Sequence, residues 1–421
     1  MKIVVLCPHF EPDTAPTGTV MTRIVHELAE RGHELHVVTS LPWYATHAVD
    51  PAWVGRWMRT ETTQWGSVTR VHPFPGADKT DLLRRALGFV GFSGLSGLAA
   101  LRAGGWCRRV DVVLAMSPPL TLGPTGWVTG VLRRSPLVFN IQDVFPDAAV
   151  RTGAITNRWV IAAAERLERF AYRRADAVTV LSEDLRRNVA AKLAPGHRDR
   201  LHVITNFVDT DAIRPGDRMT PYRAELDIGD EPVVLYAGNV GFSQSLDLVV
   251  AAARECPDVT FVINGDGAAR AELGRSAADV TNLRFAGYQP VERLAEVLAT
   301  GDVHVVPLRR GLGDVSVPSK SYSSLAAGRP VVASIDAGTE IPRLLAASGA
   351  GESVRPDDVG AFVEAIRALV DDPARASEMG DAGRAWVVAE ASPAAVGAAY
   401  DALLRAVAGS NARPRLEESP R

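Results

Sequence analysis

The sequence predicts an α/β protein made of two Rossmann-like domains, each built on a parallel sheet. Short runs of β-branched and other apolar residues alternate with helical patterns, and the runs are continuously apolar, as in strands covered on both faces. A polar, turn-rich segment at 206–222 interrupts this alternation, which then restarts. The 421 residues suffice for two cores. We expect domains at 1–208 and 222–391, a helix at 392–409 packing back on the first domain, and a disordered tail at 410–421.

The elements of the first domain follow from the periodicity of its apolar residues. Strands are expected at 3–7, 34–39, 110–116, 137–141, 177–181 and 201–204. Helices are expected around 19–30, over 158–174 and from residue 183. The uncharged stretch 112–132 is too interrupted by proline and glycine to span a membrane, so we expect a strand, a turn and a helix there.

The second domain repeats the pattern. Strands are expected at 233–237, 259–263, 283–286, 303–307 and 331–334, with helices at 246–255, 268–278, 290–298 and 319–327, near 340 and from 357. Parallel sheets bind ligands at the carboxyl ends of their strands. Two such sheets in tandem therefore predict an active site in the cleft between the domains.

The composition limits the class of partner. The net charge is -3, with 46 basic and 49 acidic residues, so no basic face for nucleic acid is expected. The three cysteines are odd in number and far apart, and no metal-like spacing occurs, which favours a reduced, cytoplasmic setting without a metal. The apolar run at the N-terminus is too short for a signal peptide.

One apolar segment leaves two interpretations open. Residues 86–101 carry no charge, contain several glycines and follow Arg84 and Arg85. The segment is either an internal helix of the first domain or a helix that lies on an anionic membrane surface. The second interpretation would place the protein peripherally on the inner face of the cytoplasmic membrane.

The most informative segment is 314–334. A Pro-Ser-Lys turn opens a short helix of small residues, Gly328 ends it, and Pro330 leads into a strand. Lys320 stands in the first turn, where the free N–H groups and the positive helix end attract an anion. Lysine is scarce, with four lysines against 42 arginines, which suggests a selected point charge that contacts phosphate.

Several strand-end loops add weaker signals. The loops at 238–241 and 264–267 contain glycines that allow close approach to a phosphate, although simple turn geometry explains them equally well. The loop at 8–19 offers polar side chains, of which His9 is more often structural than catalytic when nothing pairs with it. Asp143 and Asp147 follow the strand at 137–141, where carboxylates are normally solvated or capping.

Together these segments resemble glycosyltransferase family 4, the retaining enzymes of GT-B fold, from the N-terminus to about residue 408. The matching pieces are the N-terminal loop ending at Gly18 and the segments 31–39, 142–146, 180–182, 206–209, 237–241 with Gln244, 265–267, 287–288 and 314–334. The Gln-Asp-Val-Phe-Pro, Gly-Asn-Val-Gly and Pro-Ser-Lys forms are most similar to the fucosamine-type transferases of colanic acid and O-antigen synthesis.

The resemblance implies that the protein transfers a sugar from a nucleotide-diphosphate sugar, with retention at the anomeric carbon. UDP is the favoured nucleotide, and no cofactor or obligatory metal is implied. The acceptor would be a polysaccharide, a glycolipid or a small molecule. Asp143 and Lys320 would be catalytic, and His9, Glu11 and Asp13 would lie on the acceptor side. The implied donor-binding residues are Gly18, Asn239, Gly241, Gln244, Gly265, Asp266, Gly267, Tyr288, Ser316, Ser319, Lys320 and Ser323.

The sequence departs from the family pattern at two glutamates. Val315 and Ser323 occupy those positions, and valine cannot hydrogen-bond a sugar hydroxyl. Asn239 and Gln244 replace the usual Arg and Lys. Two alternatives follow: a non-hydrolysing UDP-sugar 2-epimerase, which would need an acid/base set that we do not find, and a non-catalytic protein that binds sugar nucleotides.

Overall fold

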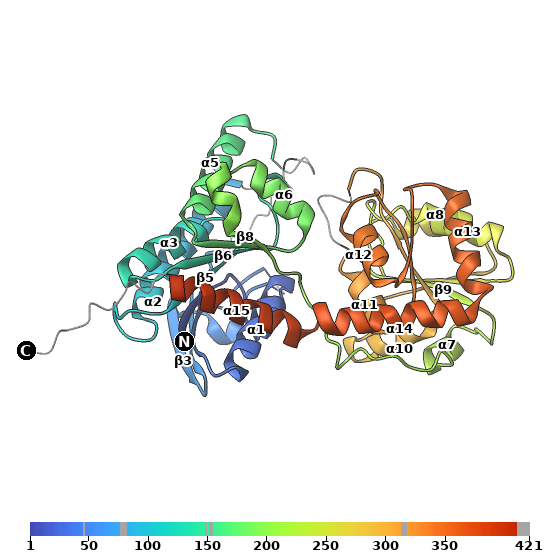
Figure 1. Ribbon diagram of the computed structural model, residues 1–421, viewed down its shortest axis with the longest axis horizontal. Coiled ribbons are helices and arrows are strands. Elements are labelled where there is room, and N and C mark those ends of the chain that lie inside the picture. Colours follow the sequence, from blue (N-terminus) through green and yellow to red (C-terminus); the bar gives the residue numbers. More distant parts are fainter. Residues whose placement is uncertain (45–46, 76–81, 148–149, 151–154, 313–317, 411–421) are drawn as a thin grey trace, which may run out of the picture. The chain divides into compact units, whose positions relative to one another are not determined.

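The computed structural model describes the chain except residues 45–46, 76–81, 148–149, 151–154, 313–317 and 411–421. The chain forms two compact units, Met1–Thr205 with Val396–Arg421 (unit 1) and Asn206–Ala395 (unit 2) (Figure 1). The tail expected at 410–421 lies outside the described residues from 411 onward.

Unit 1 is built on an eight-stranded sheet of order β3-β4-β2-β1-β5-β6-β7-β8. All its neighbouring strands pair in parallel except β3, which runs antiparallel to β4. The strands are β1 (Lys2–Leu6), β2 (Glu34–Ser40), β3 (Met58–Thr63), β4 (Gly66–Val71), β5 (Val112–Ser117), β6 (Leu137–Ile141), β7 (Ala177–Val180) and β8 (Leu201–Val203).

Helices cover both faces of this sheet. They are α1 (Pro16–Glu30), α2 (Leu82–Arg102), α3 (Leu122–Arg133), α5 (Arg158–Arg174), α6 (Glu183–Ala191) and α15 (Pro393–Ser410), with short 3₁₀ turns at Pro51–Trp53 and Pro195–Arg200. Phe139 and Ile141 of β6 join one core with Leu122 of α3. Asn140, between them, points to the opposite face and donates to the Tyr400 hydroxyl of α15 at 2.6 Å.

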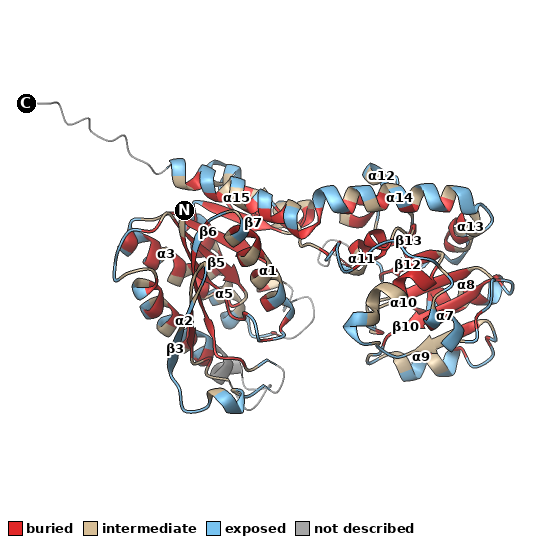
Figure 2. Cartoon of the chain, turned by 90° about the horizontal axis from the view of Figure 1, so that it is seen from below, coloured by how far each residue is buried: buried red, intermediate tan, exposed pale blue. Residues whose placement is uncertain are grey.

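Unit 2 has a six-stranded, wholly parallel sheet of order β11-β10-β9-β12-β13-β14. Its strands are β9 (Val233–Ala237), β10 (Thr260–Asn264), β11 (Leu283–Ala286), β12 (Val303–Pro307), β13 (Val331–Ser334) and β14 (Gly351–Val354). Its helices are α7 (Pro221–Glu225), α8 (Asp247–Glu255), α9 (Arg270–Ser276), α10 (Leu294–Thr300), α11 (Lys320–Ala326), α12 (Glu340–Ser348), α13 (Val359–Val370) and α14 (Pro373–Glu390), with a 3₁₀ turn at Val291–Arg293. The buried residues concentrate on the strands and the inner sides of the helices (Figure 2).

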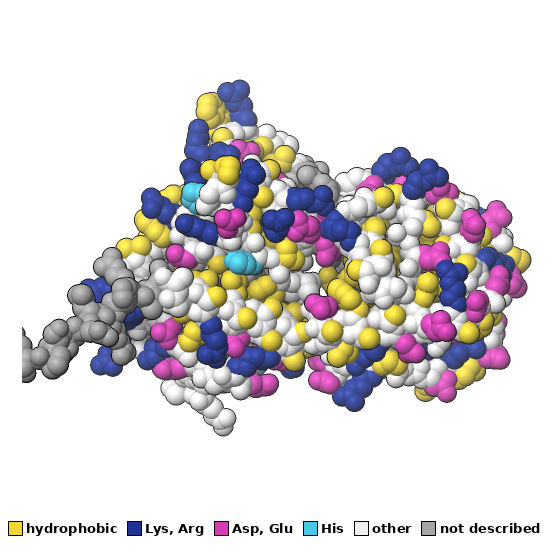
Figure 3. Space-filling view, viewed as in Figure 1, with side chains coloured by type: hydrophobic (Ala, Val, Ile, Leu, Met, Phe, Trp, Pro, Cys, Tyr) yellow, Lys and Arg dark blue, Asp and Glu magenta, His cyan; other side chains and the backbone are white. Residues whose placement is uncertain are grey.

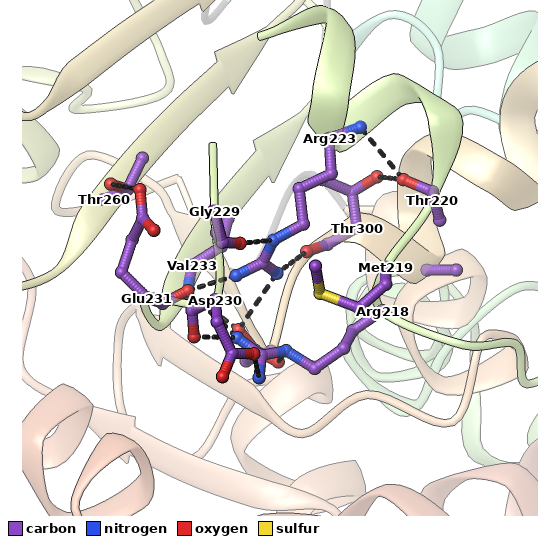
Figure 4. A network of polar contacts seen from close by, with 12 residues as sticks. Arg218, Met219, Thr220, Arg223, Gly229, Asp230, Glu231, Val233, Thr260 and Thr300 are labelled. Atoms are coloured by element: carbon purple, nitrogen blue, oxygen red, sulfur yellow. Dashed lines mark hydrogen bonds and ion pairs between the residues drawn. The ribbon is translucent and has the colours of Figure 1, made fainter. Parts of the chain in front are cut away.

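A buried arginine fastens the start of unit 2 to its sheet. The guanidinium of Arg223, on α7, donates to the carbonyl oxygens of Gly229 at 2.6 Å, Thr300 at 3.2 Å and Glu231 (Figure 4). Thr220 caps the same helix by accepting the Arg223 backbone N–H at 3.1 Å. These bonds satisfy carbonyl groups that burial would otherwise leave unpaired.

The predicted fold class is confirmed, and its elements fall close to the expected ranges. The stretch 112–132 forms β5, a turn and α3, as predicted. The strands β3, β4 and β14 and the helices α7 and α14 were not predicted from the sequence. The stretch Pro373–Ser410 is long and apolar enough to cross a membrane, but half of its most apolar window is buried within the protein.

Candidate functional site

Two glycine-containing loops meet at the carboxyl edge of the unit 2 sheet. The Gly238 N–H, just after β9, donates to the Asn264 carbonyl at the end of β10 at 2.9 Å. A Cβ atom on Gly265 would lie 1.8 Å from the Gly238 carbonyl oxygen, and the φ of Gly265 is +151°. Both the close packing and the backbone conformation therefore require glycine at 265.

Lys320, the first residue of α11, points to the same edge. Its Nζ donates to the Tyr236 hydroxyl at 2.7 Å and lies 4.4 Å from the centre of the Tyr236 ring. The Tyr236 hydroxyl in turn donates to the Asn239 carbonyl at 2.6 Å. Among the described residues no carboxylate lies within ion-pair distance of Lys320, and burial lowers the pKa of its ammonium group to about 8.

A cavity of about 120 Å³ opens beside Lys320. Lys320 and Ser323 line one wall, and apolar side chains of α10 line another. Whole drug-sized ligands occupy pockets of at least about 300 Å³, so this cavity fits only one part of such a ligand. Its lining residues are Ala237, Gly238, Asn264, Tyr288, Gln289, Leu294, Val297, Leu298, Lys320 and Ser323.

A second polar centre lies in unit 1, in the loop after β1. His9 Nδ1 and the Asp13 carboxylate are 2.7 Å apart, and both side chains are buried. The other Asp13 oxygen accepts the Tyr44 backbone N–H at 3.1 Å, so the carboxylate is held in place. The imidazole ring lies 5.6 Å from the Trp43 ring and 5.4 Å from the Tyr44 ring, between centroids.

His9 also lines a cavity of about 330 Å³ that is walled mainly by aromatic and proline side chains. Aromatic faces with one oriented polar group suit a ligand that has both apolar surface and hydroxyl groups. The lining residues are Pro8, His9, Thr17, Ser40, Trp43, Tyr44, His47, Pro73, Phe74, Pro75, Gly88, Phe89, Phe92, Pro118 and Pro119.

Comparison with known proteins places both units. A glycosyl transferase 4-like domain matches residues 17–206, and a domain of glycosyl transferases group 1 matches residues 231–372. The chain belongs to the family 4 glycosyltransferases. The colanic acid biosynthesis glycosyl transferase WcaI of Escherichia coli is 29% identical over 390 residues, which cover 87% of this chain and 91% of WcaI.

Two further similarities concern donor and fold. The GDP-mannose-dependent alpha-(1-6)-phosphatidylinositol monomannoside mannosyltransferase of Mycolicibacterium smegmatis is 33% identical over 225 residues, covering 51% of this chain and 58% of that enzyme. Anabaena HepE, solved with UDP and glucose, matches with a TM-score of 0.67 at 15% identity, covering 96% of this chain and 100% of HepE. The predicted family and GT-B fold are thus confirmed.

The residues predicted on the donor side of this glycosyltransferase divide into two groups. Lys320, Ser323 and Tyr288 line the cavity. Gln244 instead accepts the Gly241 N–H at 3.0 Å, and the Asn239 side chain packs where Cβ atoms on Gly241 or Gly267 would lie. In this glycosyltransferase Asn239 and Gln244 therefore shape the loop itself.

Two more of the predicted donor-side residues, Asp266 and Ser319, do not line the cavity but neighbour residues that do. Asp266 is exposed, and its carboxylate accepts the Gly267 N–H at 2.7 Å, while its carbonyl accepts the Tyr288 hydroxyl at 3.3 Å. Ser319 is the exposed N-cap residue of α11, and its side chain caps nothing. Ser316 and Val315 lie outside the described residues.

The acceptor-side residues also divide. His9 and Asp13 pair, whereas the Glu11 carboxylate lies 2.9 Å from His26 Nε2 and does not line the cavity. Gly18, which was predicted to bind the donor, lies in the first turn of α1, where a Cβ atom would come within 2.8 Å of the His9 Cβ. Gly18 therefore makes room for His9.

The two carboxylates after β6 have different surroundings. Asp147 accepts hydrogen bonds from Lys192 at 2.8 Å and Asn188 at 2.9 Å, which is a structural arrangement. Asp143 is exposed at the end of β6, and partial desolvation raises the pKa of its carboxyl group. Asp143 belongs to unit 1 and Lys320 to unit 2, so their meeting in one active site stays a prediction.

Apart from Tyr288, the aromatic residues of the two sites were not predicted from the sequence. Tyr236, the partner of Lys320, is a buried residue near the end of β9 and reads as a core residue in the sequence. Trp43 and Tyr44 lie shortly after the end of β2, and two aromatic residues in a strand-end loop were a usable signal. Phe74 and Phe89 come from segments without a motif.

Proposed function

We propose that this glycosyltransferase moves a sugar from a nucleotide-diphosphate sugar to a hydroxyl of a polysaccharide, glycolipid or small molecule, with retention at the anomeric carbon. The supporting observation is Lys320, whose ammonium group borders a cavity and has a tyrosine, not a carboxylate, as its described partner. An uncompensated cation beside a cavity favours an anionic ligand, and diphosphate fits that description.

Lys320 would act on the leaving group. As the bond between the sugar and the β-phosphate breaks, negative charge develops on the phosphate oxygen. A fixed ammonium group in a partly dry site stabilises that charge more in the transition state than in the ground state. Asp143 would orient the reacting sugar from the unit 1 side.

His9 would bind the acceptor. Because Asp13 holds Nδ1, the tautomer with Nδ1–H leaves Nε2 as an acceptor for a hydroxyl proton. The aromatic walls of the adjoining cavity would cover the apolar faces of the acceptor. Glu11, paired with His26, has no direct part in this arrangement.

We propose UDP as the nucleotide. The crystallised complex of HepE with UDP supports this choice, whereas the GDP-mannose dependence of the mycobacterial relative supports a guanine nucleotide. Titration of UDP and GDP under one set of conditions decides between them.

One observation favours a second candidate, a non-catalytic protein that binds sugar nucleotides. Ser323 lines the cavity at a position where the family carries a glutamate, and serine is shorter and uncharged. Assays of transfer and hydrolysis with radiolabelled UDP-sugars separate the candidates. Tight UDP binding without either reaction across a donor panel would favour the binding protein.

The decisive test of the enzyme is Lys320→Ala. We expect kcat/KM to fall by about 10²–10³, the effect of removing one transition-state donor, with little change in Tm because the residue carries no ion pair to the described residues. The control is Lys2→Ala, because Lys2 belongs to unit 1 and pairs with Glu34 at 3.0 Å, whereas the cavity is lined by residues of unit 2. Unchanged turnover in Lys320→Ala would refute the assignment.

We also propose a cytoplasmic location with peripheral contact to the inner face of the membrane through residues 84–101. The helix that contains them, α2, supports both interpretations of the sequence. Phe92, Ala99 and Ala100 are buried against the sheet, whereas Leu87 and Val90 are exposed.

A further inference from the structure

An arginine-lined hollow lies at the amino-terminal edge of the unit 1 sheet. It has a volume of about 640 Å³ and is bordered by Arg109 before β5, Arg134 before β6 and Arg174 before β7. All three residues are exposed, and within the described part of the chain none has a carboxylate at ion-pair distance. Asp176, the carboxylate in the lining, accepts the Leu137 N–H at 2.8 Å.

Apolar side chains project beside this hollow. Val131 and Leu132, on the last turn of α3, are 58% and 54% exposed. Along α3 the surface continues into a second hollow of about 320 Å³ between α2 and α3, which is lined by Leu98, Leu101 and Val128 among others. Exposed and intermediate residues follow the outward sides of both helices (Figure 2). A contiguous exposed apolar strip of this kind marks an interaction surface.

The loop that joins α2 to β5 presents a tryptophan at the same place. Trp106 is 63% exposed, and the Arg102 guanidinium lies 5.2 Å from the centre of its ring. Buried Arg133 of α3 fixes this loop by donating to the carbonyl oxygens of Ala100, Ala103, Gly105 and Arg108 at 2.6 to 3.2 Å. The tryptophan is therefore held outward by a built structure.

We propose that this surface, defined by Leu98, Trp106, Val128, Val131, Leu132 and the arginines Arg109, Arg134 and Arg174, docks on an anionic phospholipid bilayer. Arginine heads match lipid phosphates, aliphatic side chains enter the acyl boundary, and tryptophan prefers the interface between them. On the face of unit 1 that Figure 3 presents, hydrophobic, basic and acidic side chains all reach the surface.

Charge complementarity favours a bilayer over a protein partner. The three exposed arginines share their hollow with one described carboxylate, Asp176, which accepts the Leu137 N–H, so positive charge predominates there. The apolar residues line an open strip, which a fluid lipid surface can follow. The surface lies at the amino ends of the strands, whereas His9 and Asp143 follow the carboxyl ends of β1 and β6. Docking would therefore leave the site edge of unit 1 uncovered.

The proposal extends the membrane contact suggested for 84–101 and places its centre on α3 and the loop at 103–109. It does not depend on sugar transfer. A chain that binds vesicles but transfers no sugar would refute the proposed transfer activity alone. A chain that transfers sugar but does not bind anionic vesicles would refute the docking surface and the membrane contact, and would leave the proposed activity intact.

Co-sedimentation of the full chain with vesicles tests the proposal. We expect binding to vesicles containing one third phosphatidylglycerol, weak binding to pure phosphatidylcholine, and loss of binding at high salt. Each arginine near an anionic surface contributes about fivefold, so Arg109→Gln/Arg134→Asn/Arg174→Gln should weaken binding roughly 100-fold. Asparagine is chosen at 134 because the φ of that residue is +54°.

The control removes the same charge elsewhere. Arg56→Gln/Arg166→Gln/Arg198→Gln replaces three exposed arginines outside this surface and should leave binding within about threefold, because electrostatic attraction to a membrane falls off within a Debye length. Equal losses in both triple variants would overturn the docking surface, because net charge alone would explain them. Failure of the wild-type chain to bind anionic vesicles would overturn it as well.

The apolar part has its own readout. Val131→Ser/Leu132→Ser should weaken vesicle binding at least tenfold with unchanged salt dependence. Trp106 fluorescence, obtained as the difference from Trp106→Phe, should shift to the blue on anionic vesicles. An unchanged emission wavelength of Trp106 on anionic vesicles would overturn the proposal. A wild-type chain that does not bind vesicles but forms a dimer, which Val131→Ser/Leu132→Ser abolishes, would also overturn it and would identify the surface as a protein interface.

Discussion

The pH dependence of UDP binding follows directly from the surroundings of Lys320. Burial lowers the pKa of this lysine to about 8 in the free protein. Lys320 is therefore protonated in roughly nine-tenths of the molecules at about pH 7 and in roughly one-tenth at about pH 9. A bound diphosphate favours the charged form and raises the pKa again. Binding therefore takes up a proton, and its affinity falls as the pH rises.

The magnitude follows from the two protonation ratios. Between about pH 7 and pH 9 the apparent Kd for UDP should rise about tenfold, or ~1.4 kcal/mol. The terminal phosphate of UDP has a second pKa near 6 and contributes little over this range. At about pH 8.5 each bound UDP should take up roughly 0.8 proton.

Isothermal titration in two buffers with different ionisation enthalpies measures both the affinity and the proton uptake. Lys320→Ala should bind UDP more weakly and without this pH dependence. Lys320→Arg, whose charge does not titrate in the range, should also give a flat profile. A tenfold change that persists in Lys320→Ala would refute the reasoning, as would a wild-type Kd that stays constant from about pH 7 to pH 9.

Two further outcomes test other side chains of the sites. Ser323→Glu should tighten UDP-sugar binding, measured by titration, if the cavity keeps the family's ribose geometry; weaker binding or a dead enzyme would mean that the pocket has been reshaped. His9→Ala should raise the acceptor KM more than tenfold and leave the Kd for UDP unchanged, because His9 lines the unit 1 cavity. Glu11→Gln is its matched control, since Glu11 faces His26, and equal effects of the two changes would contradict the role of His9.

The sequence predicted the fold because the parallel strands are apolar on both faces. Runs such as Val233–Ala237 and Leu137–Ile141 are buried along almost their whole length, so composition alone marks them. The strands that were missed lack this mark. Met58–Thr63 is mostly exposed and mostly polar, and Gly351–Val354 lies at a sheet edge, where only one neighbouring strand pairs with it.

Residues of the candidate site could be predicted from the sequence only where they belong to a recognisable motif. Lys320 stood out through its Pro-Ser-Lys turn and the scarcity of lysine. Its partner Tyr236 lies 84 positions earlier and is brought to it by the sheet, which no local pattern encodes. Glu11 was predicted on the acceptor side from its loop, but its side chain pairs with His26 on α1.

If Lys320 binds the diphosphate as we propose, its tyrosine partner would explain how a family 4 site can work without the usual Arg and Lys after β9. A carboxylate partner would neutralise the ammonium group and compete with the diphosphate for it. The Tyr236 ring and hydroxyl orient the ammonium group, and no carboxylate of the described residues neutralises its charge. Burial of this charge has a desolvation cost, which is why the pKa of Lys320 is lowered. The approach also requires Gly238, where a Cβ atom would lie 3.3 Å from the Lys320 side chain. The Asn239 carbonyl accepts the Tyr236 hydroxyl, so the residue at the position of the family's arginine would support the cation that we propose in its place.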